Sequence, residues 1–204
     1  MKSKLPTKYI LLGSLYTGPK HGYEIRRFLR NEMDSTWQVS TSQLYALLKK
    51  MEKDRLLNSE VELQNALPSK RIFNITDSGR ELFMEWMCNP TEHVRDLRVE
   101  FMAKIFFYYR YSLNGATELI DKQIIYLNDT RYKITQKRLN ESNFYNRLVY
   151  SYREQTIELW LQWIKKEAVP FIKIVYQKNG LSNDRAIEKK SDEIQTQPIS
   201  SIYI

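Results

Sequence analysis

The strongest pattern in the chain is a helical repeat of apolar positions that begins after residue 40. The repeat has the spacing i, i+3, i+4 and i+7, which places its members on one face of a helix. They are Leu44, Leu47, Leu48 and Met51. Ser40 and Gln43 precede them with the spacing of a capping box, in which each side chain binds the backbone N–H of the other residue. The pattern predicts an amphipathic helix over residues 41–53 with a polar and cationic outer face.

A change from helical spacing to alternation follows residue 57. Val61 and Leu63 alternate with charged and amide residues, and a second apolar group occupies residues 72–75, which is typical of two strands. The segment between them, residues 64–69, contains an Asn and a Pro, which favour a turn and interrupt a ladder. We therefore predict a β-hairpin after the helix. The cations expected at its tip are Lys70 and Arg71.

Further helices are predicted on either side of these elements. Apolar residues with helical spacing occupy the first segment of the chain and end at Gly18, and a second helix begins at His21. After the hairpin, Thr76 can cap a helix over residues 79–87. Three helices, a hairpin and a closing helix are the element order of a winged helix-turn-helix domain, which we predict over residues 1–89.

The same segments resemble the PadR-like family of transcriptional regulators, in the branch whose helical C-terminal domain is related to virulence activators. The resemblance covers residues 5–176, and its pattern is more constraining than one short motif. The segments that carry it are residues 11–13, 21–25, 42–45, 73–80, 95–96 and 104–107, together with Trp37, Leu48 and Phe101. One departure is Asp54-Arg55-Leu56, which stands where the family commonly has a Glu-Gly pair that closes the recognition helix.

The resemblance implies that the helix over residues 41–53 is the recognition helix of a DNA-binding domain. Such a helix enters the major groove, where its N-terminal side chains read base edges while cations of the helix and hairpin hold phosphates or reach the minor groove. The residues expected to contact DNA are Thr41, Ser42, Gln43, Tyr45, Lys49, Lys53, Lys70 and Arg71. Two plainer interpretations stay open: the lysines can form a solvated helix face, and Gln43 can serve as a cap alone.

The second half of the chain has helical spacing of apolar and aromatic residues throughout. We expect helices over residues 97–111, from a cap at Asn114 to Leu139, and from Phe144 onward, with an end or kink at Pro170. Helices of this length with apolar residues on more than one side commonly find the rest of their core in a second subunit. The family's pattern likewise implies a homodimer.

The predicted fold class is therefore mainly α with a small β-hairpin. It consists of an N-terminal winged helix-turn-helix followed by a C-terminal helical dimerisation domain that also has room for an effector site. Beyond residue 178 the hydrophobic periodicity is lost, so we expect disorder there. The expected divisions are residues 1–89, residues 90–178 and the tail, residues 179–204.

Aromatic residues near the expected junction of the two domains are candidates for an effector site. They are Trp86, Phe106 and Tyr109. The alternative interpretation places them in the core or in a subunit interface, which is the commoner location of large aromatic side chains. The family resemblance implies repression that is relieved by an effector such as a phenolic compound, although relatives with this C-terminal domain also activate.

Enzyme chemistry finds no support in the sequence. It has no Gly-rich phosphate loop, nucleophile motif or metal-ligand cluster, and the lone Cys88 cannot form an intrachain disulfide. We expect no cofactor and no metal. The net charge of +8, from 32 basic and 24 acidic residues, suits a polyanionic partner but is weak evidence alone. No apolar run has the length of a membrane span and no signal peptide is evident, so the expected location is the cytoplasm.

The sequence thus predicts a homodimeric, sequence-specific regulator of transcription that binds double-stranded operator DNA and responds to a small aromatic or phenolic molecule. The alternative is a protein-interaction module whose winged fold and helical arm dock another protein without reading DNA. Affinity for duplex DNA as a function of salt separates the two hypotheses. A specific reader keeps its preference among sequences when counterion competition weakens general binding.

Overall fold

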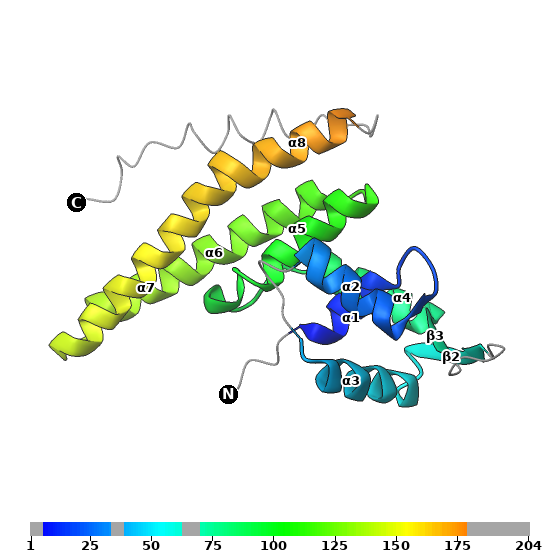
Figure 1. Cartoon of the computed structure of the whole chain (residues 1–204). Coiled ribbons are helices and arrows are strands. Elements are labelled where there is room, and N and C mark those ends of the chain that lie inside the picture. The colour runs from blue at the N-terminus through cyan, green and yellow to red at the C-terminus, as the bar shows by residue number, and fades with distance from the viewer. Residues whose placement is uncertain (1–5, 34–38, 63–69, 179–204) are drawn as a thin grey trace.

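The structure is a computed structural model that describes residues 6–33, 39–62 and 70–178 (Figure 1). Its first half contains α1 (Thr7–Ser14), β1 (Lys20–His21), α2 (Gly22–Met33), α3 (Thr41–Lys53), β2 (Leu57–Glu62), β3 (Lys70–Ile75) and α4 (Asp77–Cys88). After a short turn of 3-10 helix, Val94–Asp96, its second half contains α5 (Glu100–Tyr111), α6 (Ala116–Leu139), α7 (Phe144–Trp163) and α8 (Val169–Lys178). The predicted fold class is confirmed. Trp37, the hairpin tip and the predicted tail lie outside the described residues.

Helix α3 begins and ends where its sequence pattern predicts. The predicted capping box is present, because the Gln43 backbone N–H donates to the Ser40 hydroxyl at 3.3 Å and the Ser40 N–H donates to the Gln43 side-chain oxygen at 3.3 Å. The predicted apolar face is buried at Leu44, Leu48 and Met51. Local capping and burial of one face therefore determine both the start of this helix and its orientation.

The end of α3 takes an unusual backbone conformation at Arg55. Its φ angle of 58° lies in the left-handed region, which glycine adopts at no steric cost and other residues adopt with strain. The Leu56 N–H donates to the Met51 carbonyl at 2.9 Å and so satisfies a free carbonyl of the last turn. The helix thus closes in the conformation that a glycine normally provides, although the chain has Arg55 there.

The predicted hairpin belongs to a three-stranded antiparallel sheet within the described residues. Strand β3 is central and pairs with β2 on one side and β1 on the other. Lys20 and His21 of β1 lie opposite Phe73 and Ile72 of β3. The sequence pattern did not predict β1 and placed His21 at the start of a helix. Two residues carry no periodic signal, and it is the pairing with β3 that gives them an extended conformation.

The core of the winged region continues into α5. Phe107 of α5 is fully buried beside Gly13 of α1, and its ring meets the Phe83 ring of α4 edge to face, with centroids 5.2 Å apart. The Tyr111 hydroxyl donates to the Gly13 carbonyl at 2.7 Å. Helix α5 therefore shares a core with α1 and α4. The division into domains after residue 89 stays a prediction.

Helices α6 and α7 form a hairpin that projects away from the winged region (Figure 1). The N-cap of α6 is Gly115, with a φ of 101° and no side-chain cap, so the predicted cap at Asn114 is wrong. Pro170 lies in the first turn of α8, directly after the π-helical turn Ile164–Ala168, and this change of helical geometry accommodates a residue without an N–H. No helix among the described residues is long and apolar enough to cross a membrane.

Candidate nucleic-acid interface

The outer side of α3 carries most of the side chains expected to contact DNA. The helix lies along one side of the winged region, and the β2–β3 hairpin, the wing, lies beyond its C-terminal end (Figure 1). Its exposed residues include Thr41, Ser42, Gln43, Tyr45, Lys49 and Lys53. Because the other face of α3 is buried in the core, these side chains are presented to the solvent on a rigid element.

Gln43 has a structural role beside its predicted one. Its side-chain oxygen accepts the Ser40 N–H, so the predicted capping box is present, which leaves open whether Gln43 is a cap alone. Bidentate reading of an adenine needs both the oxygen and the amide nitrogen of Gln43. The cap hydrogen bond must therefore be shared or exchanged if Gln43 reads a base. Its contact with DNA stays a prediction.

Tyr45 is 47% exposed, and its ring lies against the first residue of α2. A Cβ atom built on Gly22 would stand 2.6 Å from the Tyr45 hydroxyl oxygen. Gly22 therefore allows α2 and the recognition helix α3 to approach closely. Tyr45 contributes to this approach as well as to the exposed surface.

Arg71 is held in an ion pair within the protein, although the sequence pattern placed it at the hairpin tip. Its Nη2 donates to both carboxylate oxygens of Glu52 at 2.9 and 3.0 Å, and its Nε donates to the Ser59 hydroxyl at 2.6 Å. Glu52 and Ser59 were not among the predicted site residues. A signal was present in the alternation of β3, which puts Arg71 on the same face as the buried Phe73 and Ile75.

Lys70 lies on the other face of β3, opposite Glu62 of β2. Its ammonium stands 5.7 Å from the centre of the Tyr23 ring. Glu62 is 3.3 Å from the Nε2 atom of His21, and the His21 ring in turn stacks on Tyr23 with centroids 5.5 Å apart. The wing is therefore in contact with β1 and α2 on this face.

A cavity of about 1210 Å3 lies where α1, α3, α4 and the segment before α5 meet. Trp86 lines this cavity and stacks on Tyr9, with centroids 5.0 Å apart and planes 2° from parallel. The Lys104 ammonium lies 5.0 Å from the centre of the Trp86 ring and donates to Glu100 at 2.7 Å. Burial lowers the pKa of Lys104, with Glu100 acting in the opposite direction, and burial raises the pKa of Tyr9. The cavity is thus lined by two stacked aromatic rings and by many charged side chains, including Glu100 and Lys104 of α5.

The other two candidate effector residues do not line this cavity. Phe106 packs against Phe28 of α2, with centroids 6.1 Å apart, and Tyr109 packs against Phe171 of α8 at 5.5 Å. The structure therefore does not bring Phe106 and Tyr109 together with Trp86. The interpretation of aromatic residues as packing elements fits these two contacts.

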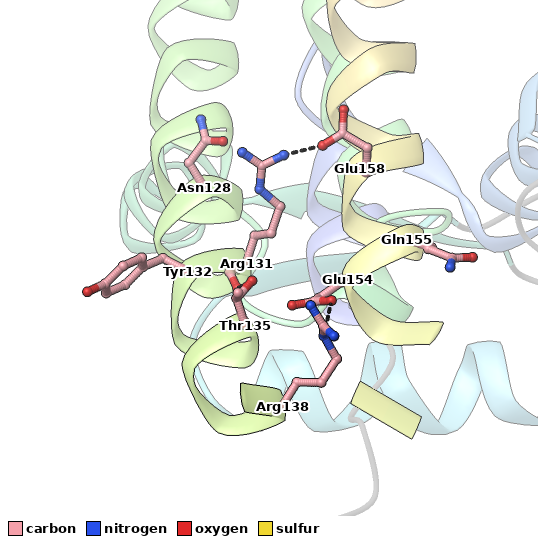
Figure 2. Close-up of a pocket in the computed structure, with 8 residues that line it drawn as sticks. All are labelled: Asn128, Arg131, Tyr132, Thr135, Arg138, Glu154, Gln155 and Glu158. Carbon is pink, nitrogen blue, oxygen red and sulfur yellow. Dashed lines mark hydrogen bonds and ion pairs between the residues drawn. The ribbon is translucent and has the colours of Figure 1, made fainter. Parts of the chain in front are cut away.

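A groove of about 480 Å3 runs between α6 and α7 (Figure 2). Arg131 of α6 pairs with Glu158 of α7, and the Arg138 Nε donates to Glu154 at 2.7 Å. Figure 2 shows both pairs bridging the two helices, whereas Tyr132 points away from them. This part of the seam between the helices is therefore polar, and the hairpin presents large apolar side chains outward.

The helices, the small sheet and the exposed helix followed by a wing define a winged helix-turn-helix protein. Residues 11–85 match the model of a family described as "Transcriptional regulator PadR-like family", so this part of the chain is similar to that family. The matched segment begins in α1, contains the recognition helix and both strands of the wing, and ends in α4.

Two relatives are named as transcriptional regulators. The chain is 28% identical to the negative transcriptional regulator PadR of Bacillus subtilis over 117 residues, which are 57% of this chain and 64% of the relative. It is 29% identical to the probable transcriptional regulator Rv1176c of Mycobacterium tuberculosis over 87 residues, 43% of this chain and 46% of the relative. The chain thus matches less than two thirds of the length of each. A crystal structure of Bacillus subtilis PadR in complex with operator DNA is 21% identical, with a TM-score of 0.43, and the match covers 83% of this chain and 99% of that chain.

Proposed function

We propose that this chain is a sequence-specific DNA-binding regulator of transcription that acts as a repressor. The observation that carries the proposal is the exposed polar face of α3, with the wing beside it, inside the segment that matches the family model. Major-groove reading requires such an exposed helix on a rigid support. The Bacillus subtilis relative is named a negative regulator, which favours repression. The proposed partner is double-stranded operator DNA, and the proposed location is the cytoplasm.

We further infer that the chain acts as a homodimer through α6 and α7. Large apolar side chains are exposed on these helices at seven-residue intervals: Ile125, Tyr132 and Leu139 on α6, and Tyr145, Tyr152 and Leu159 on α7. A seven-residue repeat keeps such residues on one stripe of a helix, which suits packing against another helix. A second copy of the chain covers these stripes and brings two recognition helices to two half-sites.

The effector proposal rests on the cavity beside the recognition helix. A planar aromatic or phenolic molecule fits its chemistry, because Trp86 and Tyr9 provide apolar surface and Lys104 with Glu100 provides polar groups nearby. Helix α3 forms part of the wall. A ligand there changes DNA affinity only if it binds two arrangements of the recognition helix with different affinity.

The proposed function is tested by selecting duplexes from fragments of the source genome with the full-length chain. A selected duplex and a shuffled duplex of the same composition are then compared in competition binding at several salt concentrations. A sequence reader keeps a preference for the selected duplex at each salt concentration, whereas a protein-interaction module shows none. The absence of any preference would reject the proposed function.

Replacing Gln43 with alanine is expected to weaken binding to the selected operator by about 1 to 3 kcal/mol and to relax the preference at one base position in each half-site. The physical reason is the loss of the paired donor and acceptor of its amide. Competition against duplexes with single base changes measures this effect.

Two further variants separate base reading from other roles. Ser40→Ala removes the other hydrogen bond of the capping box but leaves the Gln43 amide, so it should lower helix stability without relaxing the base preference. Lys70→Ala should weaken binding to all duplexes by a similar factor. It should also make the slope of log affinity against log salt concentration shallower by roughly one unit for each phosphate that is no longer neutralised. If Gln43→Ala and Ser40→Ala had equal effects on the base preference, Gln43 would be a cap alone.

A phenolic or planar aromatic compound that enters the cavity is expected to quench Trp86 fluorescence and to lower operator affinity by about tenfold, a typical coupling between two sites. Titration of a compound panel, with operator affinity measured alongside, checks the expectation. The chain has four tryptophans, so the Trp86→Phe variant is needed to show that the fluorescence change comes from Trp86. A compound that binds at Trp86 without changing operator affinity would reject the switch but not the pocket.

A further inference from the structure

Three side chains from three elements meet beside the recognition helix. Glu52 belongs to α3, Ser59 to β2 and Arg71 to β3. The Ser59 hydroxyl donates to Glu52 Oε1 at 2.5 Å, while the Arg71 guanidinium donates to the same carboxylate and to the Ser59 hydroxyl. These contacts form a closed triangle, which we call the Glu52–Ser59–Arg71 cluster.

The register of the wing places this cluster on the face that turns toward α3. Ser59 lies opposite Phe73, and Arg71 lies opposite Val61, so Ser59 and Arg71 are diagonal neighbours on one face of the sheet. The Arg71 guanidinium also stands 5.7 Å from the centre of the Phe73 ring. Arg71 thus lies on the same face of β3 as the buried Phe73, and its side chain contacts the recognition helix at Glu52.

We propose that Arg71 is a positioning residue that sets the orientation of the wing relative to the recognition helix, through Glu52, instead of contacting a phosphate itself. The proposal rests on the proposed DNA-binding function. The Arg71 guanidinium donates from Nη2 to the Glu52 carboxylate and from Nε to the Ser59 hydroxyl, and two donors held in one plane prescribe direction as well as distance. Helix α3 and the wing must hold one relative geometry if both are to meet the same duplex.

The two roles of Arg71 predict opposite effects for the removal of Glu52. If Arg71 contacted DNA directly, Glu52→Ala would release a cation and remove an anion near a polyanion, so DNA would bind more tightly. If the cluster positions the wing, Glu52→Ala weakens binding although it makes the surface more positive. The sign of the change therefore distinguishes positioning from contact.

The test measures binding of full-length variants to a duplex selected by the wild-type chain from a random pool, and to a shuffled duplex. Glu52→Ala and Glu52→Gln should weaken binding to the selected duplex by about threefold or more, the range for a partly exposed ion pair with its hydrogen bonds. The exchanged pair, Glu52→Arg with Arg71→Glu, should recover preference for the selected duplex. Glu60→Ala is the matched control, because Glu60 is an exposed acid of β2 that lies outside the cluster.

Hydrogen exchange of the β2 and β3 amides in the free protein provides a second readout. Loss of Glu52 should speed this exchange, whereas loss of Glu60 should not. Equal or tighter binding of Glu52→Ala, or failure of the exchanged pair to regain preference, would overturn the positioning role. A wild-type chain without preference for any duplex would reject the proposed function and this role with it, and unchanged exchange in Glu52→Ala would reject the attachment of the wing independently of DNA.

Discussion

Replacing Gly13 with alanine is expected to lower the free energy of unfolding by about 2 to 3 kcal/mol, a cost typical of an overpacked core. A Cβ atom at this position would lie 2.4 to 2.8 Å from three atoms of the Phe107 ring. That ring cannot move aside easily, because it is fully buried and packed against Phe83, Phe106 and Tyr111. The substitution therefore forces α1 and α5 apart. Urea denaturation at a fixed protein concentration, followed by circular dichroism, measures the change.

Gly22→Ala is a matched control for this prediction. Its Cβ would also stand closer than 3 Å to aromatic atoms, but these belong to the outer part of the half-exposed Tyr45 ring, which can swing into solvent. The cost should therefore be smaller than at Gly13. Adding Phe107→Leu to Gly13→Ala should recover part of the lost stability, because the two positions share one contact. A Gly13→Ala variant as stable as the wild type would show that α5 does not pack on α1 as described.

The double substitution Tyr132→Glu and Tyr152→Glu is expected to produce a folded monomer whose operator affinity is lower by about 100-fold. Both side chains are about two-thirds exposed and belong to the seven-residue stripes of α6 and α7. A buried carboxylate in a helix interface is strongly unfavourable without a partner. The loss of DNA affinity follows because the second recognition helix is no longer held at a high effective concentration, a gain of about 100-fold or more in linked systems. Sedimentation velocity and operator binding measure the two effects.

Lys137→Glu is the control for added negative charge on the same helix. Lys137 is exposed and lies five residues after Tyr132, so it faces another side of α6. It should leave the assembly unchanged, although it alters the net charge as much as the double substitution does. Circular dichroism confirms that each variant keeps its helices. A double variant that remained a dimer would place the subunit interface elsewhere, and a monomeric wild-type chain would reject the homodimer.

The elements predicted well from sequence are those whose conformation is set by residues within the same segment. Helix α3 was predicted with its bounds because the cap at Ser40 and the apolar repeat lie within one segment. The cap of α6 was misplaced because Gly115 in a left-handed conformation starts that helix without a side-chain hydrogen bond, and this leaves no polar signature. Strand β1 was missed because its conformation comes from pairing with β3, about 50 residues away along the chain, and not from its own two residues.

The exposure of the α3 side chains was predictable from the sequence, and the partner of Arg71 in the wing was not. The exposed face of α3 follows from the burial of its apolar face, so spacing alone predicted which side chains are exposed, whereas their contact with DNA was inferred from the resemblance and stays a prediction. The engagement of Arg71 with Glu52 joins positions 19 residues apart, and no periodicity links them. The aromatic candidates likewise separated in space: Trp86 lines the cavity while Tyr109 contacts α8, because each is directed by the face of its own helix.

The sequence by itself determined the main helices, the two strands of the wing, the apolar face of α3 and the resemblance to a DNA-binding family. These properties depend on neighbours within a few turns, and the apolar repeat of α3 is an example. The tertiary structure decided which long-range partners meet: β1 with β3, Phe107 with Gly13, and Arg71 with Glu52. Such contacts depend on the packing of whole elements, because a side chain's partner is set by the position of another helix or strand and not by its own spacing.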